Sequence, residues 1–118
     1  MGDYVRACWD KAEALRRVAG DEELLQDLCH IFLEQSPALM ERLRLAVAEG
    51  DPEAVMRAAH SLKGETSCLA AHASLLARQL EEMGRGRDLS QAVQTFELLD
   101  LEIADLRIAL QIPNGADQ

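Results

Sequence analysis

Residues 51–69 read DPEAVMRAAHSLKGETSCL, and this stretch decides the fold class. Asp51 is a typical N-cap residue and Pro52 is favoured in a first helical turn, so a helix is expected to begin here. At about 100° per residue, its apolar and small side chains fall on one stripe. The stripe consists of Val55, Ala59, Leu62, Thr66 and Leu69. We interpret this stripe as the face of the helix that packs into a core.

Helical spacing of apolar residues continues along the chain, and no stretch alternates with the period of two that a strand requires. Four long helices are expected at about 21–49, 52–68, 71–84 and 89–111, with a kink or restart at Pro37. A short helix precedes them. The connections are short, so neighbouring helices should be antiparallel. We therefore expect an all-α fold, an antiparallel up-down four-helix bundle with a short additional N-terminal helix.

The packing faces of these helices are expected to include several residues of the first and last long segments. They are Leu24, Leu28, Ile31 and Phe32 in the first, and Val93, Phe96, Leu99, Ile103, Leu106 and Leu110 in the last. The chain has 118 residues, the size of one domain. We expect a single domain with its bundle at about 10–111 and flexible tails at 1–8 and 112–118. Hydrophobic residues make up 48% of the chain, too many for disorder, and aromatic residues only 3%, too few for a typical β-sandwich.

The formal net charge is −9, because 12 basic residues face 21 acidic ones. Such a surface argues against nonspecific binding to nucleic acid or to an anionic membrane. No apolar run approaches the roughly 20 residues of a membrane span. The three cysteines, Cys8, Cys29 and Cys68, show no pairing pattern and no metal-ligand spacing with histidine. We expect a cytoplasmic monomer that has no metal or cofactor of its own.

His60 lies about 140° away from the centre of the apolar stripe, so its imidazole should point to solvent. The unprotonated nitrogen of a neutral imidazole is a competent nucleophile near pH 7. Lys63 follows one turn later, where its ammonium would stabilise an added phosphoryl group. Gly64 stands beside it, although glycine inside a helix costs about 1 kcal/mol relative to alanine. A larger side chain at this position is therefore expected to obstruct a phosphoryl group or an approaching partner.

Gly64 is expected to be the only glycine inside a helix, since the other six fall at termini or predicted boundaries. Gly84 is placed in one of these boundaries, the turn that runs to Asp88. Asp88 is expected to cap the last helix. Arg85 and Arg87 are interpreted as solvated residues of the same turn.

The segment Ala59–Gly64 resembles the His-x-Leu-Lys-Gly signature of histidine-containing phosphotransfer (HPt) domains. The resemblance extends over most of the chain, through the segments 20–25, 32–34, 48–51 and 80–89. It implies a four-helix bundle with a phosphorylatable histidine on an exposed helix face. It also implies that His60 accepts a phosphoryl group from an aspartyl phosphate on a receiver domain and passes it to another receiver.

The resemblance further implies the partners, a response-regulator receiver domain and a hybrid sensor histidine kinase. The receiver would supply Mg²⁺ and the acidic pocket, and the chain would have no kinase or ATP site. Met56, Arg57 and Ser67 surround His60 on the helical wheel and are expected to line the docking surface. Arg57 and Lys63 would form a local positive spot that favours the acidic face of a receiver.

Three departures from the family pattern accompany this match, and one is that Glu65 and Thr66 are bulkier than the small residues often found there. Ala70 stands where a second glycine is usual, ten residues after the histidine, so the helix break there is expected to be less sharp. Many relatives also carry a polar side chain about 22 residues after the histidine, which holds its ring. The stretch before this position looks one residue short, so Glu81 and Glu82 compete for the ring-orienting role.

Two other interpretations stay open at this stage. The same face could bind a receiver or another signalling protein without being phosphorylated, which would make the chain a four-helix adaptor. The chain could also be the phosphoacceptor domain of a chemotaxis kinase, whose donor is ATP bound to a separate domain.

Overall fold

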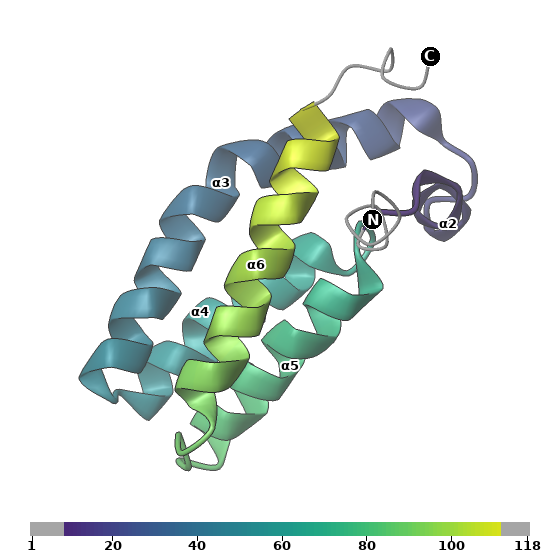
Figure 1. Ribbon diagram of the computed structural model, residues 1–118. Helices are drawn as coiled ribbons and strands as arrows, with labels where there is room; N and C mark the ends of the chain where they lie inside the picture. The colour runs from purple at the N-terminus through teal and green to yellow at the C-terminus, as the bar shows by residue number, and fades with distance from the viewer. Residues whose placement is uncertain (1–8, 112–118) are drawn as a thin grey trace.

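The computed structural model describes residues 9–111, and within this range the chain forms five helices (Figure 1). They are α2 (Lys11–Arg17), α3 (Glu22–Glu49), α4 (Pro52–Thr66), α5 (Ala71–Arg85) and α6 (Ala92–Gln111). Each long helix packs on the next, and α6 closes the bundle by packing on α3. Helices α4 and α6 stand diagonally, with no pair of their Cα atoms within 8 Å. The predicted all-α up-down bundle with a short first helix is confirmed. The tails predicted at 1–8 and 112–118 lie outside the described residues.

Local capping residues set the helix ends. The carboxylates of Asp21 and Asp51 accept hydrogen bonds from backbone N–H groups in the first turns of α3 and α4, at 3.0 and 3.2 Å. Gly50 ends α3 in the left-handed conformation, with φ of 66°. Asp88 does not cap α6 as predicted, because its carboxylate accepts from the Ser90 N–H at 3.1 Å and closes a turn instead. Helix α6 therefore begins at Ala92 rather than at about 89. Separately, α4 ends at Thr66, two residues earlier than expected.

The core lies between the four long helices. All five residues of the predicted α4 stripe are buried. Leu24, Ile31 and Val93 are exposed instead, which corrects their assignment to packing faces. In each case the preceding or following residue takes the core position, since Leu25, Phe32 and Ala92 are buried.

Helices α4 and α5 make the closest packing in the bundle, and Gly84 makes it possible. Gly84 is buried within α5, so the prediction that it lies in a boundary turn is wrong. A Cβ atom at this position would lie 2.5 Å from the Pro52 carbonyl oxygen and 2.7 Å from the Met56 backbone nitrogen. These are backbone atoms that cannot rotate away, so only glycine fits.

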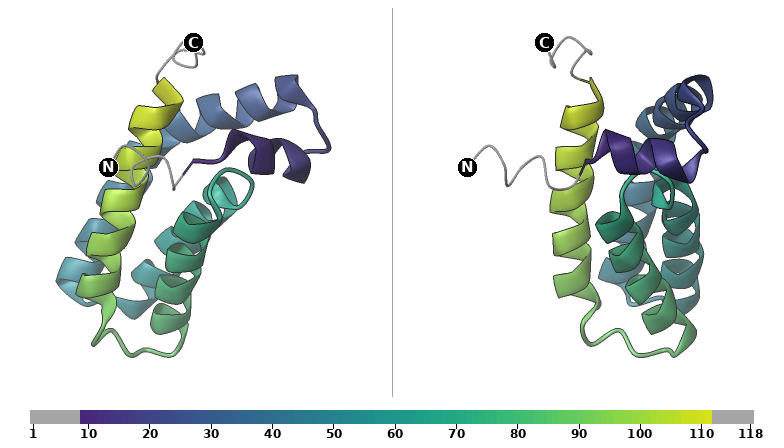
Figure 2. Two further views of the ribbon diagram at one scale, coloured as in Figure 1. Left: turned by 45° about the vertical axis from the view of Figure 1, so that its right-hand side comes forward. Right: turned by 90° about the vertical axis from the view of Figure 1, so that its right-hand side faces the viewer.

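Helix α3 runs through Pro37 without a break, and Figure 2 shows that it changes direction along its length. Proline has no N–H, so the Leu33 carbonyl, four residues earlier, loses its partner within the helix. Arg107 of α6 replaces that partner, because its Nη1 donates to the Leu33 oxygen at 2.9 Å. The same nitrogen lies 2.8 Å from Oγ of Ser36, a fully buried side chain. Helix α3 thus does not restart at Pro37, as one of the two predicted alternatives had it, but continues as a bent helix that α6 supports.

Helix α2 crosses the end of the bundle near the α4–α5 connection (Figure 2). Its Arg17 donates to the Cys68 carbonyl oxygen at 3.3 Å, just beyond the last turn of α4. Trp9 precedes α2 and packs, partly buried, against the core. The short helix therefore covers the end of the core at the α4–α5 connection.

Replacing either helical glycine by alanine should shift stability in opposite directions. We expect Gly84→Ala to lower the free energy of unfolding by about 2 kcal/mol, because the methyl group meets the backbone of α4. Gly64→Ala is the matched control, since nothing lies within 4 Å of a Cβ there. Its helix propensity should raise the free energy of unfolding by up to about 1 kcal/mol. Urea titration followed by circular dichroism measures both, and equal stability of the two variants would contradict this packing.

Replacing Arg107 by methionine should destabilise the bundle although an arginine near the surface is usually dispensable. The variant leaves the Leu33 carbonyl and the Ser36 hydroxyl without their donor, for which we expect a loss of about 1–3 kcal/mol. Arg107→Lys serves as a control that keeps a cationic donor and should recover part of the loss. A Met variant as stable as the wild type in thermal unfolding would show that water satisfies these groups equally well.

Candidate functional site

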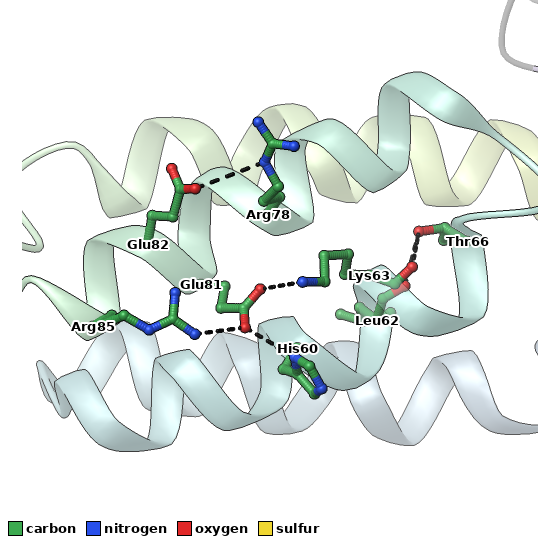
Figure 3. A network of polar contacts seen from close by, with 8 residues as sticks. All are labelled: His60, Leu62, Lys63, Thr66, Arg78, Glu81, Glu82 and Arg85. Carbon is green, nitrogen blue, oxygen red and sulfur yellow. Dashed lines mark hydrogen bonds and ion pairs between the residues drawn. The ribbon is translucent and has the colours of Figure 1, made fainter.

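The imidazole of His60 projects from the middle of α4 with its side chain 67% exposed, as predicted. One ring nitrogen, Nδ1, lies 2.8 Å from Oε2 of Glu81 on α5 (Figure 3). The helical position of His60 opposite the buried stripe explains its exposure. The contact with α5 explains why the exposed ring has a defined orientation.

Glu81 is the buried centre of the site, with only 4% of its side chain exposed. Its Oε1 lies 2.8 Å from Nζ of Lys63, and its Oε2 lies 3.0 Å from Nη2 of Arg85 in addition to His60 (Figure 3). The hydrogen bond from Lys63 lowers the pKa of Glu81 most; burial opposes this effect, and His60 and Arg85 add to it. The resulting pKa is about 2, so the carboxylate is ionised at neutral pH.

An ionised carboxylate can only accept hydrogen bonds, which fixes the tautomer of a neutral His60 ring. Nδ1 must carry the proton that it donates to Glu81. Nε2 then holds the free electron pair, on the side of the ring away from Glu81. The arrangement therefore presents one nucleophilic nitrogen to solvent in a fixed direction.

The positive charge of the site comes from Lys63 and Arg85. Together with Glu81 they leave one net positive charge in a chain whose total is −9. Arg57, predicted to contribute here, is instead paired with Glu53 at 2.7 Å. Lys63 and His60 are brought together through Glu81 and have no direct hydrogen bond to each other among the described contacts.

Arg85 was missed by the sequence interpretation, which treated it as part of a solvated turn. It belongs to the last turn of α5, four residues after Glu81, and its guanidinium reaches back to that carboxylate. Spacing of four residues between opposite charges on a helix is a recognised pairing signal. Applying it would have required knowing that α5 extends through Gly84.

The two candidates for orienting the ring occupy different environments. Glu81 faces α4 and contacts His60, whereas Glu82 is exposed and pairs with Arg78 at 3.7 Å (Figure 3). Glu82 thus lies away from the ring. The 100° step between consecutive helical residues separates them, because only one of two neighbours can face α4.

Of the remaining predicted residues, Met56 and Arg57 lie beside the ring, whereas Gly64 and Ser67 lie further along α4 and do not line the depression there. A shallow depression beside it is lined by Met56, Arg57, His60, Ser61, Glu81 and Arg85. Gly64 is exposed next to this site, and a Cβ there would meet open space, so no part of the described chain needs glycine at this position. Ser67 is exposed just after α4, and its hydroxyl donates to the Gly64 carbonyl at 3.1 Å. These residues leave the backbone of α4 accessible beside the nucleophile.

Ala70, in place of a usual glycine, has extended backbone angles with φ of −150°. Any residue adopts this conformation, so alanine imposes no strain. The break between α4 and α5 forms fully, which corrects the expectation of a less sharp break. The position therefore needs no glycine for backbone reasons.

In the part of the chain that the structure describes, no group of three His, Cys, Asp or Glu side chains is placed to hold a metal ion. Among the described helices, none combines the length and apolar character that crossing a membrane requires. The side chains that contact one another at the site are an imidazole, a buried carboxylate and two cations.

Comparison with known proteins gives a family and two similar structures. A family model described as Hpt domain matches residues 27–109. The structure of histidine-containing phosphotransfer protein B (HptB) from Pseudomonas aeruginosa is 27% identical, with a TM-score of 0.77 over 88% of this chain and 91% of that chain. The HPT domain of a sensor hybrid histidine kinase from Shewanella is 17% identical, with a TM-score of 0.80 over 89% and 92% of the two chains. None of the curated proteins matches the chain.

Replacing Glu81 by glutamine should make stability depend less on acid pH. The pKa of Glu81 is about 2 in the folded chain and roughly 4.3 when unfolded, so the unfolded state binds more protons. The stability from this group is present above pH 4.3 and is lost as the pH falls through 2. We expect wild type to exceed Glu81→Gln by about 1–2 kcal/mol at pH 7, because its cationic partners are partly solvated.

Urea titrations between pH 7 and pH 2 measure this difference, which should shrink steadily below pH 4.3. Glu82→Gln is the matched control and should lie within about 0.5 kcal/mol of wild type throughout. A difference between wild type and Glu81→Gln that stays constant down to pH 2 would disprove the proposed charge on Glu81.

Proposed function

Because the chain belongs to the Hpt domain family, whose members carry phosphoryl groups without a kinase domain of their own, we propose that His60 is its phosphoryl acceptor. In this proposal, His60 receives the group from an aspartyl phosphate of one receiver domain and passes it to another receiver. The observation that supports it best is the contact of Nδ1 with an ionised, buried Glu81, which leaves Nε2 free and exposed. An imidazole held in this way is ready for in-line attack.

In the transfer step, the electron pair of Nε2 attacks the phosphorus of the aspartyl phosphate. The bond from phosphorus to the aspartate oxygen breaks, and its electrons return to the aspartate as a free carboxylate. The ring gains positive character as the nitrogen–phosphorus bond forms, and the Glu81 carboxylate stabilises that charge through Nδ1–H. Transfer to the second receiver reverses these steps, with an aspartate oxygen as the attacking atom.

Lys63 and Arg85 have an electrostatic role in this proposal. Both are anchored on Glu81 and border the ring, so they offset the negative charge that the phosphoryl group brings. Gly64 leaves space beside the ring for the approaching receiver. We further propose that the receiver supplies Mg²⁺ and the acidic pocket, so the bundle contributes position and charge.

The docking surface proposed for the receiver is the depression beside His60 with its neighbours on α4. Met56 offers a flexible apolar contact, and the net positive charge at Lys63 and Arg85 suits an acidic partner face. Ser67 lies at the edge of this surface. The Shewanella structure is described as part of a sensor hybrid histidine kinase, and we propose a kinase of that kind as a partner on the donor side.

Treatment with a small phosphoramidate donor, followed by intact-mass measurement, tests the role of His60. We expect one acid-labile phosphoryl adduct on the wild type and none on His60→Gln. His72→Gln is the matched control, because His72 is also exposed with Nδ1 bonded to a carboxylate, Glu102, at 2.7 Å. That pair has no cation among its described ion-pair partners, so the control should label like the wild type.

Two outcomes would contradict the proposal. Loss of the adduct in His72→Gln alone would move the acceptor to α5. A wild type without any adduct, under conditions that label another Hpt domain, would favour a binding-only adaptor. Binding and phosphoryl transfer between a purified receiver and His60→Gln then separate the two cases. An adaptor keeps its affinity for the receiver in this variant, whereas a relay loses phosphoryl transfer.

A further inference from the structure

The outer side of α6 carries apolar side chains that nothing in the described part of the chain covers. Leu98, Leu101 and Ile108 are 55, 65 and 56% exposed. Leu101 and Ile108 are seven residues apart, so they lie nearly in line along the helix. They point away from the core, whose α6 members are Ala92, Thr95, Leu99, Ile103 and Leu106. Half of the large exposed apolar residues of the described chain lie on this one helix.

Helix α5 extends this apolar surface. The contact between His72 and Glu102 at 2.7 Å sets the register of the antiparallel pair α5 and α6. One turn further along α5 stands Leu75, and one turn back along α6 stands Leu98, so they border the same seam. Leu75 is 43% exposed. We call Leu75, Leu98, Leu101 and Ile108 together the α6 outer face.

The charges beside Leu98, Leu101 and Ile108 on α6 have one sign. Glu97 and Asp100 are exposed on α6, and Asp105 lies half-buried between Leu98 and Leu101 on the helical wheel. The only basic residue of α6 is Arg107, and it is engaged with Leu33 and Ser36 on α3. On α5, Arg78 stands one turn from Leu75, but it is paired with Glu82 at 3.7 Å. The α6 part of the face, where carboxylates flank the apolar residues, therefore favours a basic, apolar partner.

We propose that the α6 outer face binds an amphipathic helix of a partner protein, in which lysine or arginine flanks an apolar stripe. A second copy of this chain is a poor occupant, because two copies would bring their α6 carboxylates together. A basic amphipathic helix matches both the apolar residues and the acidic border. Such helix-on-helix recognition uses contacts at steps of three, four and seven residues. Leu98 and Leu101 are three residues apart, and Ile108 follows seven residues after Leu101.

The position of this face relative to His60 gives the contact a distinct role. Helices α4 and α6 are diagonal in the bundle, and no Cα atom of one lies within 8 Å of a Cα atom of the other. On α5, Glu81 faces α4, whereas Leu75 borders α6. A helix bound to the α6 outer face therefore leaves the imidazole uncovered, so the chain could be tethered to one protein while His60 serves another.

Fluorescence anisotropy with synthetic peptides tests the proposal. The probe is a labelled helix of about 18 residues with leucines at steps of three and four, flanked by lysines. We expect it to bind the wild type and to bind Leu101→Ser/Ile108→Ser about tenfold more weakly or worse. The matched control is Leu24→Ser/Ile31→Ser, which removes two similarly exposed apolar residues from α3 and should keep full affinity.

Two control peptides separate specific docking from general attraction to an acidic chain. A lysine peptide with scrambled leucines and a peptide with glutamates in place of lysines should both bind at least tenfold more weakly than the probe. A second variant, Glu97→Lys/Asp105→Lys, keeps the leucines and should reverse the preference between the lysine and glutamate peptides. This charge-reversal variant tests the proposal independently if circular dichroism shows that Leu101→Ser/Ile108→Ser is poorly folded.

Several outcomes would overturn the proposal. These are no binding of the probe, equal weakening in the α3 control, and equal affinity for the glutamate peptide. A wild type that dimerises in analytical ultracentrifugation, and becomes monomeric in Leu101→Ser/Ile108→Ser, would assign the face to a second copy instead.

Discussion

A buried carboxylate between α4 and α5 is the constraint on which the site depends. An ionised group removed from water must be paired, and the side chain of Glu81 meets this demand with three donors from two helices. Each donor is thereby fixed in place, including an imidazole that would otherwise rotate freely on the surface. The defined orientation of the His60 ring is thus a consequence of pairing the buried charge of Glu81.

The packing of α5 on α4 must be close enough for this pairing, and Gly84 provides the closeness. It lies three residues after Glu81, on the same side of α5, where the backbones of the two helices approach. Gly64 serves a different purpose on α4, because its missing side chain opens outward rather than into a neighbour. Gly84 therefore permits close packing inside the bundle, while Gly64 leaves the surface of α4 open.

The sequence was sufficient for features that depend on one helix at a time. Helical periodicity located the long helices, and the stripe of α4 showed that His60 points outward. Features that depend on how two helices meet were not accessible in this way. Choosing Glu81 over Glu82 requires the rotation of α5 against α4, and recognising the packing of Gly84 requires their distance. Arg85 was assigned to a turn because glycine was interpreted as the end of its helix.

Apolar periodicity also misplaced three exposed residues, because it does not distinguish which of two neighbouring positions faces the core. It assigned Leu24, Ile31 and Val93 to packing faces, yet all three are exposed. The buried side of α6 is in fact narrower, and apolar residues remain on its outer side.

The hydrogen bond from Arg107 to the Leu33 carbonyl couples positions 37 and 107, which are distant along the chain. With a residue other than proline at position 37, the helix supplies its own N–H to that carbonyl, and the arginine loses one of its two partners. Natural variation at the two positions should therefore be correlated, with arginine retained at 107 chiefly where proline stands at 37. Such covariation would record a hydrogen bond that crosses the bundle, independently of any selection on the face around His60.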